Sequence, residues 1–572
     1  MGLYVSLNLT PTIAADQWDS FWCDSLRLLQ KFPLRLVRAA MRKTPYGNQK
    51  IWTDKLTASD KHGEYWEIAG DAESLIFGGP VRLYRNLEYY QQKWKRLKQD
   101  NPPPNDDPLF CVFQDFAEEN GNVPLSGVQI FNEKTQGYPY HHAVVAVVTL
   151  AEHCFPLHSF AWGDLCPDAC NLGREWLSSL YEEEILSPIC LDAARLWNRI
   201  EGVCGDIPTT MNRFEERFLG TTVQRIHRML AESRETTMQK LAGDLLQYDT
   251  VTLGFRELAK SFLEATDDLD LFLDLIDLRN TLASDKKARK KKRPVINLED
   301  VLKMLAKGFV TYSQWQGEEI RTLRRWIEMK GNVVHAINTA LLNAILPDFF
   351  DYYCPEKDLL ETFTRREPAK QKKFSKVLHV ALQENLEAEE MIKDFVQTIQ
   401  GKAEAKARDS ETADEDDEDT DNRFVQFMKD EVSIQSELSE PLSEKNVAKL
   451  GRYIGFYVDQ MQQIISDMEE GGCLTDPTGN SQRKLLLAII QQNGGRLLEE
   501  AILAIEQTDD MESLKLFASV SPFLFAEQFR SLGSVMFSEG FEVVYPVLWH
   551  VLNKPVWWQI FQEHRNDGLN EG

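Results

Sequence analysis

A short acidic tract divides the chain, because it offers a folded core almost nothing to bury. Nine of the thirteen residues from Asp409 to Asp421 are acidic, and none of the thirteen is a large apolar residue. Such a segment cannot offset its conformational entropy by burying apolar surface, and its like charges repel one another. We therefore expect residues 401–423 to form a disordered acidic linker between folded parts.

The remaining sequence is long enough and apolar enough to form several domains. The chain has 572 residues, 43% of them hydrophobic, whereas single cores stop growing at about 250–300 residues. Its net charge of −25 argues against a general nucleic-acid binder, which presents a basic face. The nine cysteines are too scattered for a disulfide framework, and the longest apolar run, Ala143–Ala151, is too short to span a membrane. We expect a cytoplasmic, reduced protein with no direct nucleic-acid or membrane contact.

Strand and helix patterns mix in residues 1–204. Apolar residues alternate from Leu3 to Leu9, which is typical of a strand, and apolar residues from Trp18 to Leu29 recur at helical spacing. Further strands are expected at 65–68, 74–84 and 109–113, and helices at 141–152 and 168–181. These patterns predict an N-terminal α/β or α+β domain.

Residues 205–400 read as a helical domain, with helices expected at 210–247, 251–266, 298–307, 312–328, 332–346 and 371–400. A basic run between Lys286 and Arg293 interrupts it. The run is either a nucleic-acid patch or a solvated loop between two helices, and the loop is the commoner structure for such runs.

Residues 424–572 are expected to form a C-terminal helical bundle. A stripe of apolar residues from Val447 to Met468 follows the 3–4 spacing of a helix, which fits a coiled-coil seam or the buried face of a bundle helix. The bundle is favoured because further apolar helices follow at 484–506 and 513–530. The predicted fold is therefore mixed and predominantly α.

No motif for enzyme chemistry is present in the sequence. Neither GxxxxGK[ST] nor GxGxxG occurs, so the phosphate-binding loops of nucleotide enzymes are missing. The densest reactive cluster is His153, Cys154, His158, Cys166 and Cys170. Its spacing fits no common zinc pattern, and the adjacent His153 and Cys154 would point apart on a helix. We expect no catalytic residues, no metal and no cofactor.

The segment directly after the acidic tract is the remaining candidate site. Large apolar side chains here stand beside the linker, in the sequence Phe424, Val425, Gln426, Phe427, Met428, Lys429 and Asp430. Two interpretations stay open: the start of an amphipathic helix of the C-terminal domain, or a short motif that a partner binds as an extended strand. At such a helix end, Met428 would pack few neighbours.

This arrangement resembles the protein substrate of the type III-E CRISPR-guided caspase (Craspase), whose protease is a caspase-like TPR-CHAT protein. In that family an N-terminal region and a helical C-terminal domain are joined by a flexible linker, and the activated protease cuts after a methionine and before a lysine near the linker's end. The matching bond is Met428–Lys429. The resemblance further implies binding to an extracytoplasmic-function-type sigma factor and to a small accessory protein.

Three functions follow as hypotheses. The first is a non-enzymatic regulatory protein of an antiviral system, which switches its binding of a sigma factor when it is cut. The second is a constitutive helical scaffold or adaptor without proteolytic regulation. The third, a zinc-dependent or cysteine-dependent hydrolase centred on residues 153–170, is disfavoured by the ligand spacing.

Overall fold

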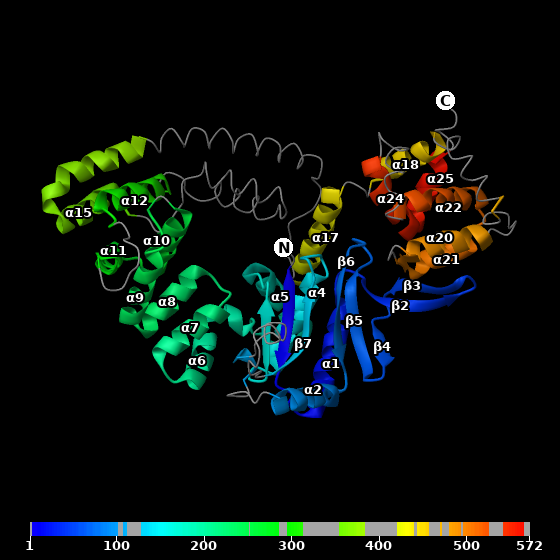
Figure 1. The fold of residues 1–572 in the computed structure, drawn as a ribbon, viewed down its shortest axis with the longest axis horizontal. Helices are drawn as coiled ribbons and strands as arrows, with labels where there is room; N and C mark the ends of the chain where they lie inside the picture. The colour runs from blue at the N-terminus through cyan, green and yellow to red at the C-terminus, as the bar shows by residue number, and fades with distance from the viewer. Residues whose placement is uncertain are drawn as a thin grey trace. The chain divides into compact units, whose positions relative to one another are not determined.

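The computed structural model describes residues 3–100, 107–110, 127–250, 252–284, 295–312, 354–383, 420–439, 443–456, 470–471, 480–492, 496–525 and 541–565. Their contacts group the chain into two compact units: Met1–Ile189 together with Asp417–Gly572, and Cys190–Asp416. The fold is mixed and mostly helical, with strands concentrated in the N-terminal region, as the sequence predicts (Figure 1). No described helix is both long and apolar enough to cross a membrane.

The first unit begins with a three-stranded antiparallel sheet. Strand β1 (Tyr4–Leu9) lies at its centre, between β7 (Val128–Lys134) and β8 (Ser159–Gly163). The strand predicted from Leu3 to Leu9 is confirmed. Its polar residues Ser6 and Asn8 are also buried, because both faces of this central strand are covered rather than one.

A second, six-stranded sheet has the order β4-β5-β2-β3-β9, with β6 also pairing with β5. Gly47, whose φ is 115°, closes the tight turn of the hairpin between β2 and β3. All pairings in this sheet are antiparallel except the one between β3 and β9. The strands are β2 (Leu36–Thr44), β3 (Gly47–Thr53), β4 (Thr57–Asp60), β5 (Gly63–Asp71), β6 (Phe77–Tyr84) and β9 (Leu497–Leu498).

Helix α1 (Ala15–Lys31) is fixed to strand β6 through buried indole groups. Trp18 donates its Nε1–H to the carbonyl of Tyr84 at 3.2 Å, and Trp22 donates to the carbonyl of Leu83 at 3.0 Å. A buried indole needs such an acceptor, since an unpaired polar group inside a core is destabilising. Helix α2 (Leu87–Asp100), α4 (His141–Cys154) and α5 (Pro167–Tyr181) complete this part.

Two features of the N-terminal prediction need correction. The strand expected at 109–113 is wrong where the structure describes it, because Pro108–Phe110 forms a 3₁₀ turn, η1. The helix α6 (Ala193–Cys204), placed by the sequence within the N-terminal domain, packs against α7 (Ile207–Arg217) in the second unit. The contacts therefore separate the units before α6 rather than after it.

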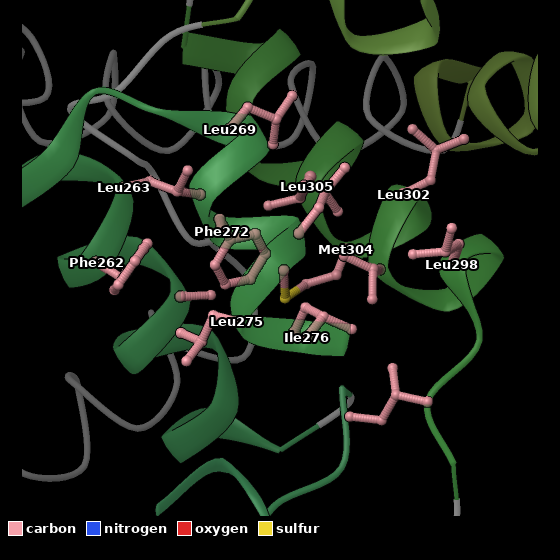
Figure 2. Packing of buried hydrophobic residues seen from close by; sticks show 14 of the residues in the cluster. Phe262, Leu263, Leu269, Phe272, Leu275, Ile276, Leu298, Leu302, Met304 and Leu305 are labelled. Carbon is pink, nitrogen blue, oxygen red and sulfur yellow. The ribbon is translucent and has the colours of Figure 1, made fainter. Parts of the chain in front are cut away.

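The regular elements described in the second unit are helices, and none of them is a strand. Helix α11 (Leu269–Ser284) is buried on more than one face, since Leu271, Phe272, Leu273 and Leu275 are all buried. Figure 2 shows Phe272, Leu275 and Ile276 of this helix among apolar side chains of its neighbours. The other labelled helices after α7 are α8 (Thr222–Glu232), α9 (Arg234–Leu245), α10 (Leu253–Thr266), α12 (Leu298–Tyr312) and α15 (Glu356–Arg366).

The helices expected in this unit are confirmed where they can be seen. The helix expected at 210–247 is divided by a capping box at Thr221, whose side chain accepts from the N–H of Gln224, and by a cap at Ser233. Residues 371–383 are helical. The expected helices at 312–328 (apart from Tyr312) and 332–346, together with the basic run 286–293, lie outside the described residues.

The C-terminal part of the first unit is a set of helices around one apolar cluster that also contains residues of the second sheet. Val447 and Leu450 are buried in it, which favours a bundle face over a coiled-coil seam for this part of the stripe. The helix expected at 484–506 is broken by β9. The helices described after α17 (Thr420–Ser439) are α18 (Glu444–Phe456), α20 (Asn480–Gln492), α21 (Glu499–Gln507), α22 (Met511–Phe525), α24 (Phe541–Asn553) and α25 (Pro555–Arg565).

Candidate functional site on helix α17

The candidate segment lies inside a helix, α17 (Thr420–Ser439). Phe424 and Met428 are 1% and 0% exposed, whereas Lys429 is exposed. Phe427 is half-buried, so the covered positions recur with the i, i+3, i+4 spacing of an amphipathic helix. The helical interpretation of residues 424–430 is therefore confirmed.

The buried face of α17 packs on helix α5 of the N-terminal α/β part (Figure 1). The ring of Phe424 stacks on Trp176 with centroids 4.6 Å apart and planes at 14°. Phe32, just after α1, meets Phe424 edge-on at 5.9 Å. Met428 follows on the same face one turn later. The first half of α17 thus belongs to the α/β part, although the sequence placed it in the C-terminal bundle.

Met428 is not at a frayed helix end. It lies eight residues after Thr420, where α17 begins, which is about two turns at 3.6 residues per turn. The expectation that this side chain packs few neighbours is wrong, because it is completely buried. The exposed partners Gln426 and Asp430 form a hydrogen bond of 2.8 Å across one turn on the outer face.

Two adjacent histidines begin α4, and the second of them, His142, contacts α17. His142 meets the ring of Phe427 edge-on, with centroids 5.1 Å apart. His141 is buried, and its Nδ1 lies 2.6 Å from the hydroxyl of Thr135. Burial lowers the pKa of His141 to about 4. Burial, and in addition the electrostatic effect of the neighbouring His141, lowers the pKa of His142 to about 3. Both imidazoles are therefore neutral near pH 7.

Charged groups at the edge of this interface are weaker contacts. Arg423 lies 3.8 Å from Glu175, and both side chains are largely exposed, so the pair contributes little. Glu431 is half-buried on α17, and burial raises its pKa. Aromatic packing, rather than charge, is what mainly holds α17 on α5.

The histidines and cysteines of the possible metal cluster lie in separate surroundings. Nε2 of His153 is 3.6 Å from Glu183, and Nδ1 of His158 is 3.2 Å from the hydroxyl of Thr12. Cys170 is buried in α5, and burial raises the pKa of its thiol to about 12, which makes it a poor nucleophile. Cys154 and Cys166 are exposed at the end of α4 and the start of α5. Within the described ranges, no group of three or more His, Cys, Asp or Glu residues is arranged to hold a metal.

Most of the acidic linker, residues 401–419, lies outside the described residues, and its expected disorder stays a prediction. Sequence reasoning missed the partners of α17, namely Phe32, His142 and Trp176. Phe32 and Trp176 are visibly apolar in the sequence, but nothing local connects any of the three with residues more than two hundred positions away.

Comparisons of the chain with protein-family models, curated proteins and solved structures gave no match.

Proposed function

We propose that the chain is a non-enzymatic regulatory protein of a type III-E CRISPR antiviral system. In this proposal an RNA-activated, caspase-like TPR-CHAT protease cuts the bond between Met428 and Lys429 in the cytoplasm. The cut switches the binding of an extracytoplasmic-function-type sigma factor and of a small accessory protein. The resemblance of the sequence is the source of these partners, and the net charge of −25 is compatible with a basic, DNA-binding sigma factor.

The observation that carries the proposal is the position of this bond within α17. Cutting after Met428 would leave residues 420–428 as a nine-residue helix on the N-terminal fragment. Isolated helices shorter than about 12–15 residues are marginal in water. The short helix would therefore detach more readily from α5 and uncover Trp176, Phe32 and His142. A single cut would change a surface without unfolding the α/β part.

Burial of Met428 makes local opening a step of the proposed reaction. A protease binds its substrate in an extended form, so α17 must leave its helical, docked state before the bond is accessible. Acids near the bond would attract a basic protease cleft, and salt would weaken that attraction. The intact protein is then resistant to general proteolysis at this bond and is cut by a protease that captures the open state.

The test is to incubate the protein with the RNA-guided effector and its protease, with and without target RNA. We expect one cut, a new N-terminus at Lys429, and a changed affinity for the sigma factor measured on the same samples. Cleavage at another bond, or no cleavage with active protease, would refute the assignment. Cleavage without any change in sigma-factor affinity would refute the switch.

The burial of Met428 also favours a second function, the constitutive scaffold. A fully buried residue in a docked helix is what a permanently folded adaptor would show. In that case α17 stays intact in the presence of the active protease, and both parts of the first unit serve as fixed binding surfaces. The same incubation separates the two functions.

A further inference from the structure

The two sides of the Met428–Lys429 bond are joined at a second interface, away from α17. Strand β9, from the C-terminal side, pairs in parallel with β3 of the N-terminal hairpin, so that Leu497 faces Ile51 and Leu498 faces Trp52. The strand extends the six-stranded sheet at the edge of β3. Backbone pairing of this kind is the mode by which extended segments are added to an open sheet edge.

Charged residues fix the start of helix α21 on the same hairpin. The guanidinium of Arg35 donates to both carboxylate oxygens of Glu500, at 2.8 and 2.7 Å. Arg42 lies 3.3 Å from Glu499 and 3.6 Å from Glu506. A two-pronged contact between guanidinium and carboxylate specifies geometry as well as charge. The hairpin therefore binds a strand, β9, that runs directly into a helix, α21, whose first turn carries two glutamates.

Apolar contacts complete this interface. Trp52 stacks on Phe77 with centroids 4.1 Å apart, and the guanidinium of Arg496 lies 4.7 Å from the Trp52 ring. Val37 and Ile51 are buried in one cluster with apolar residues of the C-terminal helices. Burial of apolar surface does not weaken at high salt, in contrast to the ion pairs.

We propose that the β2–β3 hairpin is a binding surface for the C-terminal fragment as a separate chain, so that cutting leaves a nicked two-chain complex. The cut itself rests on the proposed function, but the interface does not. None of the contacts named here involves α17: the strand pairing, the ion pairs and the Arg496–Trp52 contact join residues 35–52 to residues 496–506, and the apolar cluster adds residues of the helices after α17. Cutting removes the high effective concentration that the covalent link gives, and the contacts then act as an ordinary protein–protein interface. The regulatory change would come from α17, and release of the fragment would need a second event that opens the hairpin interface.

The experiment uses the full chain with an affinity tag at its N-terminus, cut in two ways. One arm uses the RNA-activated protease, and the other uses an unrelated site-specific protease whose recognition sequence is inserted after Ser439. We expect the C-terminal fragment to be retained on the affinity resin and to co-elute at the size of the uncut protein, in 0.5 M salt as well as at low salt. Separate elution of the fragment after the second cut would overturn the proposal. Failure of only the first protease to cut would instead count against the proposed function.

Charge reversal at the interface supplies the matched control. In the nicked protein, Glu500→Arg should accelerate dissociation of the fragment about tenfold, and the double variant Arg35→Glu with Glu500→Arg should restore retention. The control is Glu216→Arg, which breaks the pair of Glu216 with Arg213. That pair has the same 2.7 Å distance and similar exposure, 49% and 53% against 40% and 46% for Arg35 and Glu500. Equal dissociation in Glu500→Arg and Glu216→Arg would overturn the assignment of the surface.

Discussion

At the residue scale, Met428 has two roles that substitution can separate. Its side chain is fully buried against the α/β part, and it stands directly before the proposed cut. Met428→Ala should lower the free energy of unfolding by about 2–5 kcal/mol, because it removes buried methylene and sulfur contacts and leaves a cavity. Urea unfolding measures this change. Lys429→Ala, at the exposed neighbouring position, is the control and should change stability by less than about 0.5 kcal/mol. Equal effects of the two substitutions would contradict the packing of α17.

The two histidines at the start of α4 predict a dependence of stability on pH. Their pKa values in the folded protein, about 4 and about 3, lie below the value of about 6.5 in an unfolded chain. The unfolded chain therefore binds more protons at these two groups than the folded protein does. The stability that they contribute is complete above about pH 6.5 and falls as the pH decreases toward 4. The carboxyl of Glu431, whose pKa burial raises, acts in the opposite direction.

Comparison with a His142→Gln variant isolates this contribution. Between pH 7.5 and 5.5 the wild-type protein should lose roughly 1 kcal/mol more stability than the variant, because the variant has no imidazole to protonate beside Phe427. Other groups with shifted pKa values, such as His550 and Asp71, contribute equally to both proteins and cancel in the difference. Identical pH profiles would show that the environment of His142 is not what the structure indicates.

At the scale of the element, the sequence predicts that α17 is a helix, but it does not predict that this helix packs on α5. The spacing of Phe424, Phe427 and Met428 marks one face of a helix, and the structure confirms it. The partner of that face depends on tertiary packing with α5, which the local pattern does not encode. The hairpin of β2 and β3 was missed because Arg38, Arg42 and other charged residues interrupt its apolar alternation. Strand β9 was missed because its two residues are too few to show any period.

Cutting should change the behaviour of α17 selectively. Before the cut, the amides of residues 424–428 should exchange slowly, because they lie within a docked helix of twenty residues. After the cut, exchange in 420–428 should accelerate by at least tenfold, since the remaining helix is too short to be stable alone. Mass-spectrometric hydrogen exchange measures both states, with residues 193–204 of α6, in the second unit, as the internal reference. Unchanged protection after the cut would mean that the short helix stays docked.

At the scale of the whole molecule, the sequence predicted the mixed, mostly helical fold with strands in its N-terminal region. It did not predict that residues near both ends of the chain share one compact unit. The residues that make the joining contacts, such as Arg35 with Glu500 and the strands β3 and β9, lie hundreds of positions apart in the sequence. Their pairing depends on complementary surfaces, and neither surface shows a distinctive pattern by itself.

In the proposed function, opening of α17 controls access to the Met428–Lys429 bond. Loosening the docked helix from outside should therefore accelerate cleavage without altering the sequence that the protease reads. Trp176→Leu does this, because it removes the stack on Phe424 and lies on α5 rather than on α17. Trp197→Leu is the matched control, since Trp197 is equally buried but lies in the second unit beside Phe214.

The decisive measurement is the initial rate of cleavage of the wild type, Trp176→Leu and Trp197→Leu by the same RNA-activated protease. When opening is fast compared with cutting, the rate follows the population of the open state, and about 1.4 kcal/mol of lost docking energy gives a tenfold change. We predict that Trp176→Leu is cut several-fold to tenfold faster than the wild type, whereas Trp197→Leu is cut at the wild-type rate. Equal rates for all three proteins, or slower cleavage of Trp176→Leu, would contradict control of this bond by α17.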